Sequence, residues 1–151
     1  MSSPDFARLG EVYPRYLNAV VLHGLATSQA VGMGPTDFYA LGTLAFHGRM
    51  TSGELAAKTG LTTGATTRLI DRLEEHGRVR RVPDPADRRR VLVEAVETDE
   101  TDLDAALAPA RERLAKIFAS CTAEELAVLT EHFERATPAF HEAIAAMRGS
   151  H

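Results

Sequence analysis

The sequence is poor in cysteine and has no tryptophan. Its one cysteine, Cys121, excludes an internal disulfide and is typical of a protein that works in a reducing cytoplasm. No apolar run approaches the roughly 18 residues that a membrane span requires. The first residues also lack the basic segment and apolar core of a secretory signal. We therefore expect a cytoplasmic protein with no membrane partner and no disulfide framework.

Several chemical motifs are absent as well. The sequence has no Gly-rich phosphate loop, no nucleophile-elbow serine and no His-Glu-x-x-His. His132 and His141 are nine residues apart, so one helix face does not bring them together as a metal site would require. Cys121 has no base near it in the sequence, which favours a packed thiol over a redox switch. We expect no enzymatic activity, no metal and no cofactor.

The charges that are present are unevenly distributed along the 151 residues. The chain has 44% hydrophobic and 25% charged residues, as one ordinary domain or one domain with an extension would have. Its net charge is −4, yet residues 49–90 contain ten Lys and Arg against six Asp and Glu, a net +4, which leaves −8 for the rest. This pattern is typical of a surface that binds a polyanion, although solvent-exposed faces would give the same count.

The first third of the chain predicts two helices. Residues 6–31 carry apolar side chains at the spacing of one helix face, with Pro14 near an early kink. A Gly-Pro segment breaks this helix. Thr36 or Asp37 then caps a second helix that ends near His47, before a short link.

Two further helices follow in close order. Thr51 and Glu54 have the spacing of a capping box, and the helix that they open stops at Gly60, a left-handed C-cap. Thr62 caps a longer helix that ends at Gly77. Two helices joined by a Gly-containing turn of this length predict a helix-turn-helix.

The second of these helices has two distinct faces. The side that should pack inward consists of Thr66, Leu69, Ile70 and Leu73. The outward side consists of Thr63, Gly64, Thr67, Arg68 and Asp71. Small side chains let a helix approach a DNA groove closely, and an arginine can contact a guanine edge with two hydrogen bonds. The alternative is a solvent-exposed helix with an Asp71–Arg72 charge pair on its surface.

A basic hairpin follows this helix directly. Residues 78–82 alternate basic and apolar side chains, as a strand with one buried face does. Residues 83–87 are a turn signal, and a second strand covers residues 91–96. A helix-turn-helix followed by a hairpin is a winged helix, whose recognition helix enters the major groove and whose wing reaches toward the minor groove. The expected contacts to phosphates are Arg78, Arg80, Arg81, Arg88, Arg89 and Arg90.

The remaining sequence is helical. Residues 99–119 carry an apolar stripe with Pro109 as a kink, and Thr122 with Glu125 forms a second capping box. That box opens a final helix, which Pro138 should bend. The terminal helices are more apolar than one small winged helix needs for its own core, which predicts a subunit interface.

The predicted fold class is mainly α (α+β): a winged helix-turn-helix with a two-stranded β wing, flanked by N- and C-terminal dimerisation helices. The expected parts are an N-terminal dimerisation helix (residues 1–34), a DNA-binding domain (35–97), C-terminal dimerisation helices (98–148) and three residues that look like a cloning-tag remnant (149–151).

The stretch from Met50 to Val96 resembles the MarR family (multiple antibiotic resistance regulators), most specifically in the strings TTRLIDRLEEHG and DPADRRRV. The order of elements along nearly the whole chain is similar to that family as well. The resemblance implies a homodimeric, cytoplasmic, bacterial transcription regulator that binds double-stranded DNA at a near-palindromic operator. Family members usually repress, and many release DNA when a small phenolic or aromatic ligand binds between the dimerisation helices and the winged helix.

The resemblance also implies roles for single residues. The family's recognition-helix contacts match Thr62, Thr63, Gly64, Thr67 and Arg68. The far side of its wing matches Arg88, Arg89 and Arg90, and the first Asp of the wing matches Asp84. Ala86 departs from the pattern, because many relatives carry there an arginine that inserts into the minor groove. Either Arg88 performs that insertion or it does not occur. Gly64 also departs, because relatives often have serine at this position.

Five side chains are candidates for lining the implied ligand pocket: Tyr13, Tyr16, His23, Phe38 and Phe46. Ordinary core packing is the alternative for each of them. Two other functions stay open at this point. One is a winged-helix interaction module that does not read DNA, which the net negative charge and Ala86 support. The other is a protein that binds a small molecule in the dimer cleft.

Overall fold

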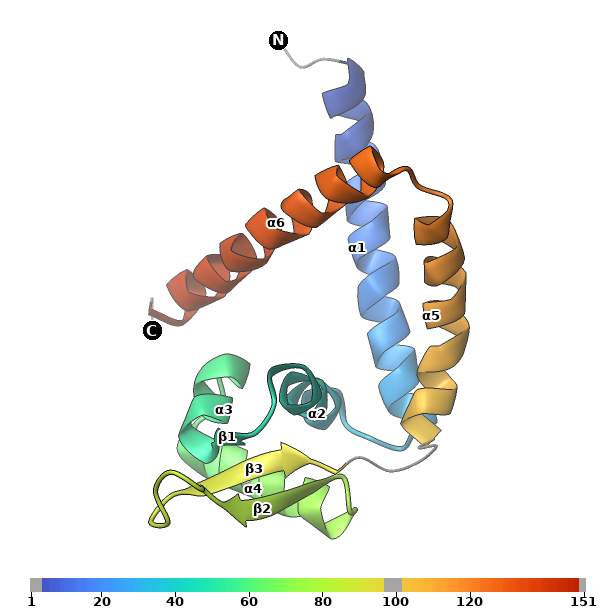
Figure 1. Cartoon of the computed structure of the whole chain (residues 1–151). Coiled ribbons are helices and arrows are strands. Elements are labelled where there is room, and N and C mark those ends of the chain that lie inside the picture. The colour runs from blue at the N-terminus through green and yellow to red at the C-terminus, as the bar shows by residue number, and fades with distance from the viewer. Residues whose placement is uncertain (1–3, 97–101, 150–151) are drawn as a thin grey trace. The chain divides into compact units, whose positions relative to one another are not determined.

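The computed structural model of the chain describes residues 4–96 and 102–149 (Figure 1). The chain divides into two compact units, Met1–Ala106 and Leu107–His151, and each is described by itself. The expected boundary at residues 97 and 98 lies outside the described residues, as do Ser150 and His151 of the tag-like end.

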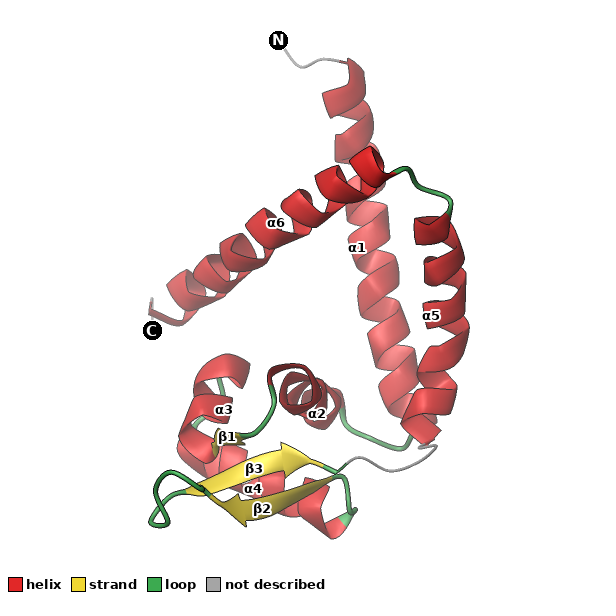
Figure 2. Ribbon diagram, viewed as in Figure 1, coloured by secondary structure: helices red, strands yellow, loops and turns green. Residues whose placement is uncertain are grey.

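The first unit contains a helix-turn-helix and a β hairpin. Its elements are α1 (Pro4–Ala30), α2 (Pro35–His47), β1 (Met50–Thr51), α3 (Ser52–Thr59), α4 (Thr63–Glu75), β2 (Val79–Pro83) and β3 (Val91–Ala95). Figure 2 shows the hairpin of β2 and β3 with its loop projecting beyond the strands, next to the helices α3 and α4. This order confirms the predicted winged helix, with α4 as the recognition helix and the hairpin as the wing.

The small sheet has one strand that the sequence analysis did not predict. Its order is β1–β3–β2, all antiparallel, with Met50 opposite Val93 and Arg80 opposite Glu94. The extra strand, β1, follows from the cap of the next helix. Thr51 caps α3 with an extended backbone (φ −70°, ψ 159°), and this conformation also lets residues 50–51 pair with β3.

The core of the first unit lies between α2, α3, α4 and the sheet. It consists of Ala40, Leu41, Leu44, Met50, Leu55, Leu69, Ile70, Leu73, Val79 and Val93. The predicted inward face of α4 is therefore confirmed. Thr66 on that face is fully buried, and its hydroxyl donates to the Thr62 carbonyl at 3.0 Å, so no polar group is left unsatisfied. Burial of each large aliphatic side chain stabilises the fold by about 1.5–3 kcal/mol, which fixes the face that α4 presents outward.

The helix starts follow the predicted caps with one exception. The Thr51 hydroxyl accepts from the Glu54 amide at 3.2 Å, and the Glu54 carboxylate accepts from the Thr51 amide at 2.7 Å, which confirms the capping box. The prediction that Thr36 or Asp37 caps α2 is wrong. Gly34 is the N-cap and Pro35 occupies the first turn, where its missing N–H costs nothing.

The helix α1 contacts α2 at a glycine, Gly24. A Cβ atom at Gly24 would lie 2.6 Å from the Tyr39 hydroxyl oxygen, closer than packed atoms come. Thr27 and Ser28 are buried on the same part of α1 and donate their hydroxyl hydrogens to carbonyls of their own helix. Small and internally satisfied residues thus let α1 pack on α2, while Pro14 lies within the uninterrupted helix.

The second unit begins at Leu107, within α5 (Asp102–Ala119), and includes the whole of α6 (Ala123–Gly149). The second capping box is confirmed, because the Thr122 amide donates to Glu125 at 2.8 Å and the Glu125 amide donates to the Thr122 hydroxyl at 3.2 Å. Apolar side chains remain exposed along both helices: Leu114, Ile117, Phe118, Leu126, Val128, Phe133, Phe140, Ile144 and Met147. In the described part of the chain, no helix has the length and apolarity that crossing a membrane requires.

Candidate nucleic-acid interface

The outward face of α4 is open and mostly small. The residues predicted there, Thr63, Gly64, Thr67, Arg68 and Asp71, are all exposed. The Thr67 hydroxyl donates to the Thr63 carbonyl at 3.0 Å, and its lone pairs stay available to an outside donor. Nothing lies within 4 Å of a Cβ placed on Gly64. A groove wall can therefore approach the first two turns of this helix.

Thr62 differs from these residues because its side chain caps the helix. The Thr62 hydroxyl accepts from the Ala65 amide at 3.3 Å, and the Thr62 backbone is extended. The free amides at the first turn of α4 form the positive end of the helix dipole, which favours a phosphate nearby. Thr62 thus builds the anion-attracting end of the helix.

Arg72 on α4 does not form the surface pair with Asp71 that the alternative of a solvent-exposed helix included. Its guanidinium instead donates to both carboxylate oxygens of Asp37 on α2, at 2.7 and 3.1 Å. These hydrogen bonds raise the pKa of Arg72. The Asp71–Arg72 pair of that alternative does not form, because Arg72 donates to Asp37 of α2 and Asp71 accepts from Arg81 of the wing.

Asp71 belongs to a second cluster, which involves Arg81 of β2. The Arg81 guanidinium donates to Asp71 through Nη2 at 2.5 Å and to Glu74 through Nη1, and the Arg81 amide donates to Glu74 at 3.0 Å. The hydrogen bond to Asp71, followed by that to Glu74, raises the pKa of Arg81. Arg81 is therefore committed to two carboxylates of the recognition helix, which does not fit its predicted role as a phosphate contact.

Arg80 lies on the opposite face of β2. Its Nε donates to the Glu94 carboxylate, directly across the sheet, at 2.7 Å. Arg49 approaches the other oxygen of Glu94 at 3.6 Å. One carboxylate thus serves two guanidinium groups, and the cluster retains one net positive charge.

The wing loop is ordered by two aspartates. Asp84 is 92% buried (relative exposure 8%), its Oδ1 accepts from the Ala86 amide at 2.9 Å, and its Oδ2 lies 3.7 Å from Arg90 Nε. The Asp87 carboxylate accepts from the Arg89 amide at 3.0 Å. Arg90 also lies 3.9 Å from Glu54. Asp84 and Arg90 accordingly shape the loop from within.

Three exposed arginines of the candidate interface have no ion pair among residues 4–96 and 102–149: Arg68, Arg88 and Arg89. All three are exposed, one on the outward face of α4 and two in the wing loop. Arg78 is half-buried just before β2 and likewise has no ion-pair partner in the described ranges. The exposed arginines without an ion pair thus lie on the recognition helix and in the wing loop, the two parts that contact DNA in a winged helix.

Comparison with known proteins identifies the family. A family model described as MarR family matches residues 31–90. The uncharacterized HTH-type transcriptional regulator YcgE of Bacillus subtilis (strain 168) is 38% identical over 122 residues, which cover 81% of this chain and 79% of that protein. The chain belongs to the MarR family.

Two other MarR-family and HTH-type proteins extend this finding. The solved structure of a MarR family protein from Bacillus stearothermophilus has a TM-score of 0.62 and 28% identity, and the match covers 96% of this chain and 99% of that one. The HTH-type transcriptional repressor NicR of Pseudomonas putida is 34% identical over 76 residues, which cover 50% of this chain and 48% of that protein. This MarR-family protein is a helix-turn-helix transcriptional regulator that binds DNA, and it is not an enzyme.

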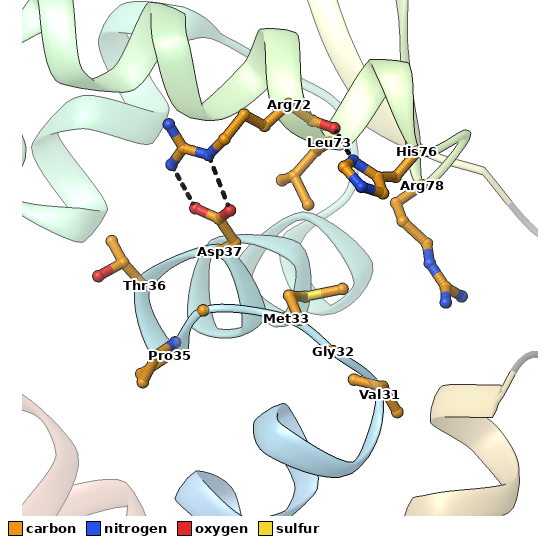
Figure 3. A pocket seen from close by; sticks show the side chains of 11 residues that line it. Val31, Gly32, Met33, Pro35, Thr36, Asp37, Arg72, Leu73, His76 and Arg78 are labelled. Carbon is orange, nitrogen blue, oxygen red and sulfur yellow. Dashed lines mark hydrogen bonds and ion pairs between the residues drawn. The ribbon is translucent and has the colours of Figure 1, made fainter.

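A pocket in this MarR-family regulator lies between the loop that joins α1 to α2, the start of α2 and the end of α4. Its volume is about 460 Å³. Figure 3 shows the Arg72–Asp37 pair on one side of it, and the Val31 and Met33 side chains on the loop between α1 and α2. His76 donates through Nδ1 to the Arg72 carbonyl at 2.7 Å, and Arg78 extends nearby. The pocket combines apolar walls with cationic groups on the recognition helix and just beyond it.

The side chains predicted to hold a ligand lie elsewhere. Tyr13 and Phe38 are half-buried, and Tyr16 and His23 are exposed on α1. Phe46, at the end of α2, is 86% exposed. None of the five lines the pocket between the α1–α2 loop, α2 and α4. Sequence spacing did not identify that pocket because its walls come from segments about 40 residues apart.

The remaining reactive side chains form no obvious site. Cys121 is half-buried between α5 and α6, and its thiol lies 3.4 Å from the Ile117 carbonyl oxygen. Within residues 4–96 and 102–149, no group of three or more His, Cys, Asp or Glu side chains is placed to hold one metal ion.

Proposed function

We propose that this regulator is a repressor that binds a near-palindromic operator as a homodimer. The observation that carries the proposal is the placement of the unpaired arginines. Arg68 lies on the outward face of α4 beside small residues, and Arg88 and Arg89 lie in the projecting wing loop. This placement suits a helix that reads base edges in the major groove and a wing that follows the backbone.

The roles of the interface residues follow from their geometry. Thr63, Gly64, Thr67 and Arg68 form the part that faces the bases, and Arg68 has the reach for a bidentate contact with guanine. Arg78, Arg80, Arg88 and Arg89 face phosphates or the minor groove. Thr62 caps α4 and so fixes the start of the recognition helix. Asp84 and Arg90 fix the conformation of the wing loop that carries Arg88 and Arg89. With Ala86 at the wing position, Arg88 supplies the minor-groove contact.

A second copy of the chain is the partner proposed for the terminal helices. The exposed apolar side chains of α1 are Phe6, Leu9, Val12, Tyr16, Val20, Val21 and Leu22, and α5 and α6 add those named above. So much apolar surface is unusual for a monomer and suits an obligate interface. A two-fold dimer presents two recognition helices to successive major grooves, roughly 34–36 Å apart. Repression is supported by the repressor among the relatives.

A small effector that releases DNA is the last part of this proposal. The pocket between the α1–α2 loop, α2 and α4 has a volume that suits a small aromatic or phenolic molecule. Arg72 lines this pocket and belongs to the recognition helix, so a ligand bound there would contact that helix and could change its position. The predicted cluster of Tyr13, Tyr16, His23, Phe38 and Phe46 stays an alternative location.

The experiment is selection of duplexes from a randomised pool by the full-length chain. The proposal predicts an enriched inverted repeat whose half-sites are centred about 10 base pairs apart. A single enriched half-site would argue against the dimer. No enrichment over the starting pool would favour the alternative of an interaction module that does not read DNA.

A further inference from the structure

Arg81 stands out because it lies in the most basic stretch of the chain and nevertheless donates hydrogen bonds to carboxylates of the protein itself. Its guanidinium contacts Asp71 and Glu74 of α4 at the same time, and its amide donates to Glu74 at 3.0 Å. Only about a third of its side chain (32%) remains exposed. Three donors of one strand residue thus meet two acidic residues of the recognition helix.

The chemistry of this contact requires an arginine. Asp71 and Glu74 are three positions apart, so they lie on neighbouring turns of one helix face. A planar guanidinium can donate to both carboxylates through separate nitrogens, whereas the single ammonium of a lysine is a point charge. The Arg81 amide also needs a partner, because β2 is an edge strand of the sheet. Glu74 satisfies that amide and closes the edge.

The position of Asp71 gives the contact a consequence for DNA. Asp71 is 57% exposed and follows Thr67 and Arg68 on the outward face of α4, one turn further along. A bare carboxylate at this point would repel the phosphates beside the groove. Arg81 places a positive charge against Asp71, which reduces the repulsion between this carboxylate and the phosphates.

We propose that Arg81 is a positioning residue for DNA reading, which locks the wing to the recognition helix and offsets one of the two negative charges of Asp71 and Glu74, without contacting DNA itself. The inference rests on the proposed function, in which the outward face of α4 reads DNA. It adds Arg81 as a residue that affects this reading although it is not one of the proposed DNA contacts. The lock fixes the angle between the helix in the major groove and the wing beside it. Specificity depends on that angle, since both parts must fit one duplex together.

A double-mutant cycle separates this role from a phosphate contact. The duplex is the one that the wild-type chain enriches from the randomised pool, and affinity is measured by fluorescence anisotropy. We expect Arg81→Met to weaken specific binding by about tenfold, within the usual range of coupling energies. In an Asp71→Asn, Glu74→Gln background the same substitution should cost less than about twofold, because no carboxylates remain to be held. A loss that is equal or larger in that background would overturn the proposal, since a freed arginine would then be binding phosphate.

Two single variants test the same point if Arg81→Met lowers the thermal stability. Arg81→Lys keeps the positive charge but loses the planar guanidinium that donates to both carboxylates. If Arg81 positions the wing, this variant should bind DNA more weakly; if Arg81 contacts phosphate, its affinity should stay near that of the wild type. Asp71→Asn removes a negative charge beside the DNA. The lock predicts a lower ratio of specific to non-specific affinity, and tighter binding to every duplex would contradict it.

Controls distinguish the possible failures. Arg135→Met removes one arginine from α6 that pairs only locally with Glu131, and it should leave DNA affinity unchanged. If the wild-type chain enriches no duplex, the proposed function and this inference both fail. If it enriches one and the cycle shows no coupling, the inference alone fails.

Discussion

Arg68 and Arg89 differ from most of the other arginines of the basic region because they have no carboxylate partner among the described residues. Both are exposed and have no ion pair within the described ranges, whereas Arg72, Arg80 and Arg81 donate to carboxylates. An unpaired guanidinium can give all its donors to DNA, so these two positions should have the largest direct effects on binding.

The first prediction at this scale concerns base readout. Arg68→Ala should relax specificity at one base pair per half-site, at a cost of about 1–3 kcal/mol on the preferred sequence. Affinities for the selected duplex and for its single-base variants would measure this change. Uniform weakening on all sequences would instead make Arg68 a phosphate contact.

The second prediction concerns charge. Arg89→Ala should weaken binding to every sequence alike and reduce the slope of log affinity against log salt by about one per subunit. Anisotropy titrations between about 50 and 200 mM salt would give that slope. A slope equal to that of the wild type, together with altered base preference, would contradict this role.

Single-residue contacts were only partly predictable from the sequence. The small and basic outward face of α4 follows from helical periodicity, and the structure has it as predicted. The partners of Arg72 and Arg81 did not follow. Asp37 is 35 positions from Arg72 in the sequence, and the fork of Arg81 depends on how β2 crosses α4. Long-range ion pairs of this kind depend on tertiary packing, which no local pattern encodes.

At the scale of elements, local rules predicted the helix boundaries well. The capping boxes at Thr51 and Thr122 are present, and Gly60 ends α3 in a left-handed conformation (φ 70°). The predicted start of α2 was wrong because the helix begins at Pro35, with Gly34 as its N-cap and no capping side chain. The strand β1 was missed because two residues carry too little pattern to distinguish a strand from a link.

The capping box of α3 gives a prediction for acid stability. The hydrogen bonds from Thr51 hold the pKa of Glu54 below its ordinary value. A carboxyl whose pKa is lower in the folded state stabilises the fold above its ordinary pKa of about 4.3, and this contribution is lost as the pH falls through the lower folded value. Urea unfolding should therefore show that Glu54→Gln destabilises the protein at pH 7, and that the difference from wild type shrinks toward pH 3.

The matched control for this experiment is Glu142→Gln, which removes an exposed carboxylate outside any capping box. Its difference from wild type should stay small at every pH. A Glu54→Gln difference that persisted unchanged at low pH would mean that the charged carboxylate is not what stabilises the start of α3.

At the scale of the whole molecule, the main feature is the apolar side chains of α1, α5 and α6 that stay exposed to solvent in the single chain. No residue of α5 is buried in the described part of the chain, and the stripe on α6 includes Phe133 and Phe140. The sequence predicted these stripes from their period. The way in which two copies combine them depends on geometry between subunits, which no pattern within one chain specifies.

Phe140→Asp tests the dimer. Placing a charge in two symmetric copies of an apolar contact should raise the dimer dissociation constant by at least about a hundredfold, because each buried aromatic contributes about 1.5–3 kcal/mol. Sedimentation velocity at micromolar concentration measures the change. The matched control, Glu142→Lys, changes the charge at an exposed polar position of the same helix and should remain dimeric. If Phe140→Asp also remained a dimer, the interface would lie elsewhere.

The most direct test of the regulator is fluorescence anisotropy of the full-length chain on the duplex from immediately upstream of its own gene. A scrambled duplex of the same composition is titrated beside it at about 50 and 200 mM salt. We predict that the upstream duplex binds about a thousandfold more tightly than the scrambled one, and that both affinities fall steeply with salt. Equal affinity for the two duplexes, or no binding at the lower salt, would contradict a sequence-specific repressor of its own promoter.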